Sequence, residues 1–424
     1  MFEFYNKLLI ILMFFLYNII IYVIILISPL IILIRVIKKK ENPKRFLEKF
    51  SIYSKRKVSG KLVWFHAVSI GEFKSIIPLI RKYEKKKNIS QILITSSTLS
   101  SSKLISKYKF RKVVHQFFPI DNHAIVKNFL NYWQPSIAIF VDSEVWPNML
   151  IQLKKLRVPI ILINARITRK SFLKWSKLKN FSNYIFNQFD LCISSNLESI
   201  KYLKQLGAKN IKYFGNLKFA EVVEEKIDLK VKFRTFLKSK KIFCASSTHE
   251  PEEKIIGEVH KRLKEKYSNL ITIIIPRHIE RTDYIENDLK SLNLRTLRYS
   301  MVNKINNSTD IIIVDSFGMT KPFFSKSKSV FLGGSLIKHG GQNPLEAVRF
   351  GCNILYGPSI HNFKEIYQFL DKEKISYRTR TANEIFLRVK KLMEKKTNKN
   401  LKNRINYIGK KILNKCFQEL NQYL

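Results

Sequence analysis

A glycine turn followed by a capped helix start makes residues 330–346 a candidate nucleotide-binding stretch. Residues 330–332 are apolar and predict a buried strand, after which two consecutive glycines permit a sharp turn. Asn343 can cap the helix that follows, and Pro344 suits its first turn. Such a helix start attracts anions, and Glu346 just inside it is placed to accept hydrogen bonds from ribose hydroxyls. The alternative is an ordinary strand-to-helix turn with a cap, because one glycine loop is a weak signal.

Polar and charged residues also follow apolar runs in the first half of the chain. They lie at residues 66–72, 95–102, 142–148 and 164–169. Ligands of parallel sheets bind at the carboxyl ends of the strands, so these four segments are further candidates for a site.

Two series of alternating strands and helices must position these residues, a pattern typical of parallel sheets covered by helices. The first series has predicted strands at residues 62–66, 92–95, 137–141, 160–164 and 191–194. The second has predicted strands at residues 242–246, 271–275, 311–314, 329–333 and 353–356. We therefore predict an α/β protein of two Rossmann-like domains facing a cleft, one half holding a donor and the other an acceptor.

Charged residues replace the strand pattern at residues 215–240, which we interpret as the connection between the domains. The predicted organisation is a membrane anchor at 1–37, an N-terminal acceptor domain at 38–215 and a C-terminal donor domain at 216–424.

The predicted anchor contains no charged residue from Leu8 to Ile34. A helix of that length, rising about 1.5 Å per residue, can cross a hydrocarbon core of roughly 30 Å. Basic residues follow it, so the rest of the chain is expected on the cytoplasmic side, with these cations against anionic headgroups. A buried core helix is the alternative, and Asn18, Ser28 and Pro29 are the main interruptions of the apolar run.

The net charge of +45 over 424 residues calls for an acidic partner: nucleic acid, a membrane surface or a phosphorylated substrate. Part of this charge reflects a general abundance of lysine. Because no nucleic-acid motif is visible, a phosphorylated lipid is the preferred partner and no nucleic acid is expected. The four cysteines show no paired spacing, which predicts a reducing compartment without a disulfide framework or a zinc site.

Eight motifs in a fixed order carry a family resemblance. They are WFHAVSIGE (64–72), DSEVWPN (142–148), NARIT (164–168), GNLKF (215–219), ASSTHEPEE (245–253), PRHIER (276–281), GGSLIKHGGQNPLEA (333–347) and GPSIHNF (357–363). The set closely resembles the 3-deoxy-D-manno-octulosonic acid (Kdo) transferases of Gram-negative lipopolysaccharide synthesis, from about residue 35 to residue 370.

This resemblance implies a GT-B fold and an inverting, metal-independent glycosyl transfer. Kdo would move from CMP-Kdo to a lipid A precursor, with no cofactor besides the donor substrate. The enzyme would lie at the bacterial inner membrane, with its catalytic domains facing the cytoplasm.

The resemblance also implies roles for two glutamates of the first half. An inverting transfer needs a base for the acceptor hydroxyl, and Glu72 occupies the position of the family's catalytic base, after Gly71. Glu144 is expected to orient the acceptor or to support Glu72. Most members have Glu-Thr-Glu where this chain has Asp142-Ser143-Glu144. Without the resemblance, Glu72 reads as a solvated glutamate in the first turn of a helix.

CMP-Kdo would be held by residues of the second half: Pro276, Arg277, Phe317, Gly318, Met319, Asn343 and Glu346. Arg277 at a strand end would bind the phosphate and stabilise the leaving group. Phe317 would stack on the base. Met319 stands where the family usually has glutamate, which removes a polar contact.

A hydroxyl-rich turn, Ser97, Thr98, Ser100 and Ser101, together with Arg166 and Arg169, is a candidate acceptor site, although ordinary turn chemistry explains the serines equally well. Two alternatives to a Kdo transferase remain. One is a GT-B transferase with another sugar nucleotide, and the other is a non-catalytic protein that binds anionic lipid. The number of Kdo units added and the oligomeric state are not encoded in a readable motif.

Overall fold

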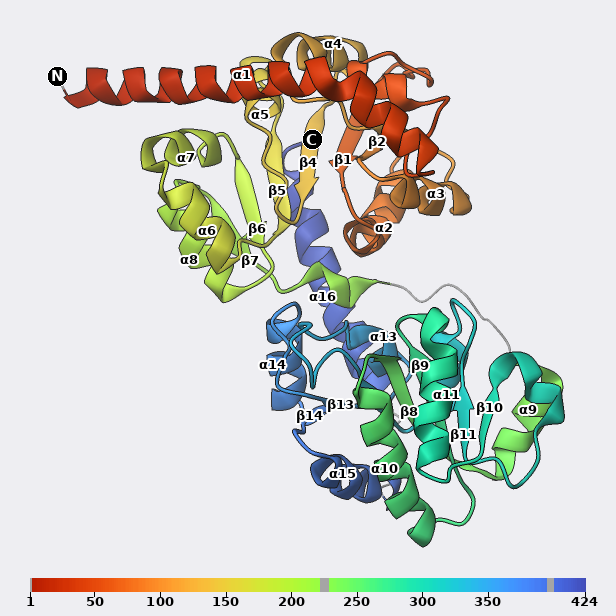
Figure 1. The fold of residues 1–424 in the computed structure, drawn as a ribbon. Coiled ribbons are helices and arrows are strands. Elements are labelled where there is room, and N and C mark those ends of the chain that lie inside the picture. Colours follow the sequence, from red (N-terminus) through yellow and green to blue (C-terminus); the bar gives the residue numbers. More distant parts are fainter. Residues whose placement is uncertain (1, 222–228, 395–399) are drawn as a thin grey trace. The chain divides into compact units, whose positions relative to one another are not determined.

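A computed structural model describes residues 2–221, 229–394 and 400–424 (Figure 1). The chain forms two compact units. Unit 1 contains the chain up to Glu221 together with Ile408–Leu424, and unit 2 contains the chain from Val222 to Tyr407. Residues 222–228, which fall inside the predicted connection, lie outside the described residues.

Unit 1 is built on a parallel sheet of seven strands within the described residues, in the order β3-β2-β1-β4-β5-β6-β7. The strands are β1 (Leu62–His66), β2 (Gln91–Ser96), β3 (Val113–Phe117), β4 (Ile137–Val141), β5 (Ile160–Ala165), β6 (Leu191–Ser194) and β7 (Ile211–Tyr213). The helices between them are α2 (Ile70–Glu84), α3 (Leu99–Lys107), α4 (His123–Trp133), α5 (Pro147–Lys155), α6 (Arg169–Ser176), α7 (Lys179–Phe186) and α8 (Leu197–Gln205).

Unit 2 repeats this plan with seven described parallel strands in the order β10-β11-β9-β8-β12-β13-β14. The strands are β8 (Lys241–Thr248), β9 (Leu270–Pro276), β10 (Thr296–Arg298), β11 (Ile311–Ile313), β12 (Ser329–Leu332), β13 (Asn353–Tyr356) and β14 (Ser376–Arg378). The helices are α9 (Val231–Phe236), α10 (Glu252–Lys266), α11 (Thr282–Ser291), α12 (Thr320–Phe324), α13 (Leu345–Arg349), α14 (Lys364–Lys372) and α15 (Ala382–Glu394).

All ten predicted strands are confirmed, with bounds that differ by a few residues. The structure adds β3, β7, β10 and β14, which are the outermost strands of the two sheets. The interior strands β1, β4, β9 and β12 are fully buried and largely apolar, as expected for a parallel sheet covered on both faces. Each sheet therefore presents the carboxyl ends of its strands along one edge, where the predicted site segments lie.

The C-terminal helix α16 (Asn400–Asn421) returns the chain to unit 1. Gly409 packs so closely that an added Cβ would lie 2.2 Å from the carbonyl oxygen of Phe219, and Ile412 lies beside Gly215. The sequence pattern predicts a second domain over the whole of 216–424, whereas residues 408–424 pack with unit 1. The physical reason is this close helix contact, which the sequence pattern does not reveal.

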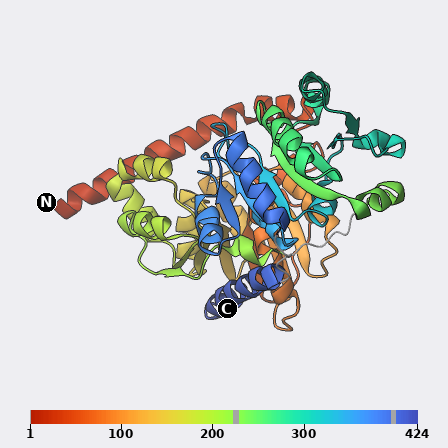
Figure 2. The ribbon, with the colours of Figure 1, turned by 90° about the horizontal axis from the view of Figure 1, so that it is seen from below.

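The apolar N-terminal segment forms one helix, α1 (Phe2–Ile37), long and apolar enough to cross a membrane. In Figures 1 and 2 it runs as a single long rod whose N-terminal end extends past the helices of unit 1. A short 3-10 helix at Phe46–Phe50 follows it and precedes the first sheet. The four cysteines of the chain, Cys192, Cys244, Cys352 and Cys416, are all buried and unpaired.

Candidate active site

Glu72 lies in the first turn of α2. Its backbone N–H donates to the hydroxyl of Ser69, the N-cap residue, at 3.2 Å. In return, its carboxylate accepts from the Ser69 hydroxyl at 2.7 Å and from the backbone N–H of Val68 at 2.8 Å. This reciprocal arrangement is a variant of the capping box in which the carboxylate binds the N–H of the residue before the N-cap, and it fixes the carboxylate at the carboxyl end of β1.

The pKa of Glu72 is raised to about 7, chiefly because burial disfavours the charged carboxylate. The hydrogen bonds from Ser69 and Val68 act in the opposite direction, whereas the negative charges of Asp142 and Glu144 raise the pKa further. A carboxyl group with a pKa near neutrality can accept a proton from a hydroxyl and release it again, which is the requirement for a general base.

The hydroxyl-rich turn at residues 97–101 contacts the segment that precedes α2 and Glu72. Thr98 caps α3, and its hydroxyl accepts from the backbone N–H of Ser101 at 3.2 Å. The Ser101 hydroxyl donates to the carbonyl oxygen of Val68 at 2.8 Å. The N–H of Val68 donates to Glu72, so these hydroxyls stabilise the segment that positions the Glu72 carboxylate. Turn chemistry thus accounts for Thr98 and Ser101, and an acceptor-binding role for this turn stays a prediction.

Glu144 lies after β4 and is partly buried among aromatic side chains. It accepts a hydrogen bond from the indole nitrogen of Trp146 at 2.9 Å, and its Oε2 lies 3.4 Å from Nε2 of His66. The opposite nitrogen of the fully buried His66 lies 2.9 Å from the hydroxyl of Thr95. Three strand ends, those of β1, β2 and β4, therefore orient this second carboxylate.

Two residues near the ends of β4 and β5 have a left-handed backbone that most side chains disfavour. Asp142 has a φ of 68° and Asn164 a φ of 53°. Asn164 is held there because its side-chain oxygen accepts from the backbone N–H of Leu217 at 2.9 Å. The N–H of Arg166 donates to the carbonyl oxygen of Asp142 at 3.1 Å. Asp and Asn tolerate this conformation best, and such positions concentrate at functional sites.

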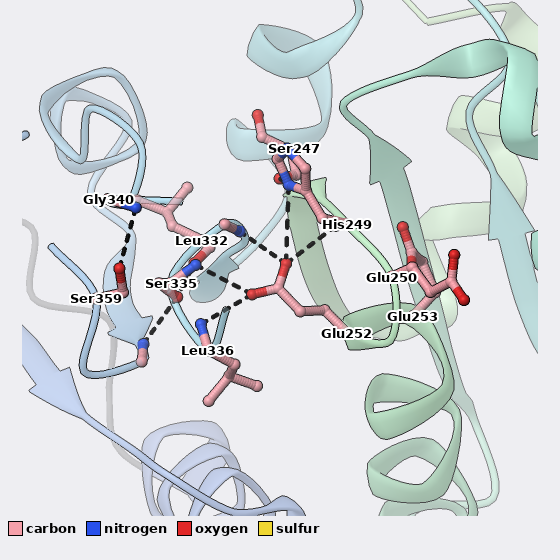
Figure 3. A network of polar contacts seen from close by, with 12 residues as sticks. Ser247, His249, Glu250, Glu252, Glu253, Leu332, Ser335, Leu336, Gly340 and Ser359 are labelled. Atoms are coloured by element: carbon pink, nitrogen blue, oxygen red, sulfur yellow. Dashed lines mark hydrogen bonds and ion pairs between the residues drawn. The ribbon is translucent and has the colours of Figure 1, made fainter. Parts of the chain in front are cut away.

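In unit 2, the buried carboxylate of Glu252 joins two loops at the carboxyl ends of β8 and β12 (Figure 3). One of its oxygens accepts from the backbone N–H groups of His249 at 3.0 Å and Gly334 at 2.7 Å. The other accepts from Ser335 at 3.1 Å and Leu336 at 3.0 Å. Burial raises the pKa of Glu252, and these four donors oppose that increase by stabilising the carboxylate.

The two glycines predicted to turn the chain after β12 are required by this contact. A Cβ on Gly333 would lie 2.4 Å from the carbonyl oxygen of Ser247 and 2.7 Å from the Glu252 carboxylate. Gly334 has a φ of 65°, which is left-handed. Glycine thus lets the chain approach the β8 loop closely enough for Glu252 to reach the turn.

Three histidines and an arginine gather around this turn. The rings of His249 and His339 lie 4.4 Å apart between centroids, and those of His249 and His278 lie 5.8 Å apart. The backbone N–H of Arg277 donates to the carbonyl oxygen of Thr248, and its side chain is exposed at the end of β9. Burial, together with His339, His278 and Arg277, lowers the pKa of His249 to about 4. Such a cluster favours an anion, because a bound negative charge would reduce the repulsion between Arg277 and any protonated histidine of the cluster.

The remaining predicted donor residues lie after β11 and at α13. Asn343 accepts from the backbone N–H of Leu345 at 3.1 Å, but it is not the predicted N-cap, because α13 begins at Leu345, has five residues and has Pro344 as its N-cap residue. Glu346 accepts from the hydroxyl of Thr320 at 3.3 Å, so these two segments meet. Pro276 is buried at the end of β9. Phe317 is 75% exposed, Gly318 has a φ of 79°, and Met319 precedes α12.

The structure therefore brings Glu72 and Glu144 to one sheet edge in unit 1, and the predicted donor residues to the strand ends of unit 2. Sequence reasoning missed Glu252 and His249 as individual residues, although both stand in the motif ASSTHEPEE. The signal that points to Glu252 is an acidic residue in the first turn of a helix after a strand, in a position to bind backbone N–H groups.

Glu252→Gln is expected to lower the free energy of unfolding by about 3 kcal/mol, because the amide NH2 would face two buried N–H donors. Thermal unfolding of the full chain measures the loss, and hydrogen exchange at residues 334–336 locates it. Glu250→Gln is the matched control, since the Glu250 side chain is 78% exposed. An equal effect of both changes would contradict the role of the four hydrogen bonds.

Comparison with known proteins identifies the family. The family model described as 3-deoxy-D-manno-octulosonic-acid transferase (kdotransferase) matches residues 44–221. A 3-deoxy-D-manno-octulosonic acid transferase of Rickettsia bellii is 33% identical over 374 residues, covering 87% of this chain and 88% of that protein. The transferase of Aquifex aeolicus is 31% identical over 353 residues, covering 83% of this chain and 91% of its own length.

Solved structures agree on the fold. The crystal structure of UDP-GlcNAc 2-epimerase from Neisseria meningitidis has a TM-score of 0.52 with 13% identity, covering 84% of this chain and 100% of that one. At this low identity, the likeness shows the fold alone. That fold is GT-B, with two Rossmann-like units, as predicted. With sequence identity above 30% along most of its length, the chain belongs to the 3-deoxy-D-manno-octulosonic acid (Kdo) transferase family.

Proposed function

We propose that this chain transfers Kdo from CMP-Kdo to a hydroxyl of a lipid A precursor, with inversion at the anomeric carbon. Membership of the Kdo transferase family makes it a glycosyltransferase acting on Kdo. The observation that carries the finer proposal is the Glu72 carboxyl group, fixed at a strand end with a pKa raised to about 7.

Glu72 is the general base of the proposed reaction. Its carboxylate takes the proton of the acceptor hydroxyl as that oxygen forms a bond to the anomeric carbon of Kdo. The bond from this carbon to the phosphate oxygen of CMP breaks, and CMP leaves with the electron pair. Glu144 contributes negative charge that keeps the pKa of Glu72 high, and its contacts with Trp146 and His66 hold it in place.

The donor half of the proposed site is the turn of unit 2 held by Glu252. Arg277, which stands beside the histidine cluster, would supply positive charge for the phosphate and for the leaving CMP. Phe317 is exposed and available to stack on cytosine, while Asn343 and Glu346 would contact phosphate and ribose. Side chains thus supply the charge stabilisation, and no metal is assigned a role.

We also propose that the enzyme works at the inner membrane, attached by α1, with both units facing the cytoplasm. The basic residues after α1 and the net charge of +45 support this orientation and the use of an anionic, phosphorylated lipid. The other candidate, transfer from a different sugar nucleotide, is separated by competition: CMP is expected to inhibit transfer and UDP is not.

Glu72→Gln is expected to reduce Kdo transfer to tetraacylated lipid A precursor by about 100-fold or more, because the amide cannot accept the proton. The measurement is mass analysis of the lipid after incubation with CMP-Kdo and the detergent-solubilised full chain, which also counts the Kdo units added. Glu84→Gln, at the far end of the same helix, is the matched control. Substantial transfer by Glu72→Gln would exclude Glu72 as the base.

The transfer rate is expected to fall as the pH drops below about 7, where Glu72 becomes protonated. Ser69→Ala removes a hydrogen bond that stabilises the carboxylate, so it raises the pKa of Glu72 and moves this acidic limb to higher pH. Ser69→Thr keeps the hydroxyl and should leave the limb unchanged. The rate–pH profile of the three proteins is the measurement, and coincident profiles for Ser69→Ala and the native chain would contradict this assignment.

A further inference from the structure

One face of α1 is shielded from solvent along most of the helix. The side chains of Ile10, Met13 and Phe14 pack against the hydrophobic core of unit 1, and Ile21 is buried with 7% exposure. Shielded or half-buried positions continue at residues 25, 28, 32 and 35. Their spacing of three or four residues places them on one stripe of the helix.

Two polar side chains fasten the middle of this stripe to unit 1. The hydroxyl of Tyr17 donates to the carboxylate of Asp121 at 2.6 Å, and the side-chain oxygen of Asn18 accepts from the amide of Asn148 at 3.0 Å. Asp121 is 1% exposed and also accepts from the backbone N–H groups of Asn148 and Met149, so it ties α1 to the start of α5.

Separating α1 from unit 1 would be costly. The separation would remove the Tyr17 donor from a carboxylate that is buried at a loop, and a buried charge that loses a partner is strongly destabilising. It would also expose the apolar side chains of the stripe. These contacts therefore favour the docked arrangement of α1 on unit 1.

The opposite face of α1 is apolar and exposed. Leu12, Ile19, Leu26 and Leu33 stand at intervals of seven residues on this face, with exposures of 51, 43, 81 and 56%. A continuous apolar surface of this size on a folded unit marks an interaction site. Exposed lysines at 38–40 follow its C-terminal end, so charge and apolar surface adjoin.

We propose that α1 lies in the plane of the membrane, its docked face on unit 1 and its apolar face in the boundary layer of an anionic phospholipid bilayer. The stripe from residue 10 to residue 35 is about 38 Å long, which exceeds the roughly 30 Å of a hydrocarbon core. A helix docked over that length has no free stretch long enough to cross. This specifies the membrane attachment proposed above and is independent of the sugar chemistry.

The orientation of α1 is tested with four single substitutions, Leu12→Cys, Ile19→Cys, Leu26→Cys and Leu33→Cys, each carrying a nitroxide label. The natural cysteines are buried, so labelling is selective. The full chain is bound to vesicles of phosphatidylglycerol and phosphatidylethanolamine, and label depth is measured from collisions with oxygen and a nickel complex. All four labels are expected at one shallow depth, about 5–10 Å below the headgroups.

A spanning helix would give a different result, because neighbouring labels would differ in depth by about 10 Å, with Leu12 and Leu33 near opposite interfaces. That result would overturn the proposal, and so would labels that contact no lipid while the chain associates through α1 into dimers. Sedimentation of the protein with the vesicles reports attachment separately. Loss of attachment and loss of the in-plane orientation are therefore distinguishable.

The docking contact has its own control pair. Tyr17→Phe is expected to increase the mobility of the label at position 19 and to lower Tm by roughly 2–4 °C or more. Tyr22→Phe changes an exposed tyrosine on the same helix and should alter neither. Equal effects of both changes would contradict the docking by Asp121.

Discussion

Buried carboxylates that accept backbone N–H groups are the interaction on which the functional parts of this structure depend. Glu72 binds the N–H of Val68, Asp121 binds those of Asn148 and Met149, and Glu252 binds four. An ionised carboxylate is only an acceptor, so each one needs donors once it leaves water. Loops at strand ends supply such donors because their N–H groups are not used by the sheet.

The contacts of these three carboxylates have different effects. Glu252 is fully satisfied and therefore acts as a structural link between two loops. Burial raises the pKa of Glu72 towards neutrality, its two donors oppose this only in part, and two other acidic residues raise the pKa further, as the proposed general base requires. Asp121 joins the apolar helix to the folded unit through Tyr17.

The central strands of both sheets could be predicted because each is a continuous apolar run. The outer strands were missed since they are short or half exposed: β3 includes His115 and Gln116, and β7, β10 and β14 have three residues each. The motifs located the site segments. Three of the four donors of Glu252 lie more than 80 residues away along the chain, so its role needed the structure. Similarly, Asn18 was visible only as an interruption of an apolar run, whereas its partner Asn148 gives it a function.

The proposed division of labour, with proton transfer in unit 1 and nucleotide binding in unit 2, is tested most directly by titrating CMP into the full chain. Glu72→Gln should bind CMP with a Kd within about twofold of the native value, since it leaves the donor turn intact. Arg277→Gln should weaken binding by about tenfold or more, the loss of one charge-assisted hydrogen bond. Weakened binding in Glu72→Gln together with native affinity in Arg277→Gln would contradict this division.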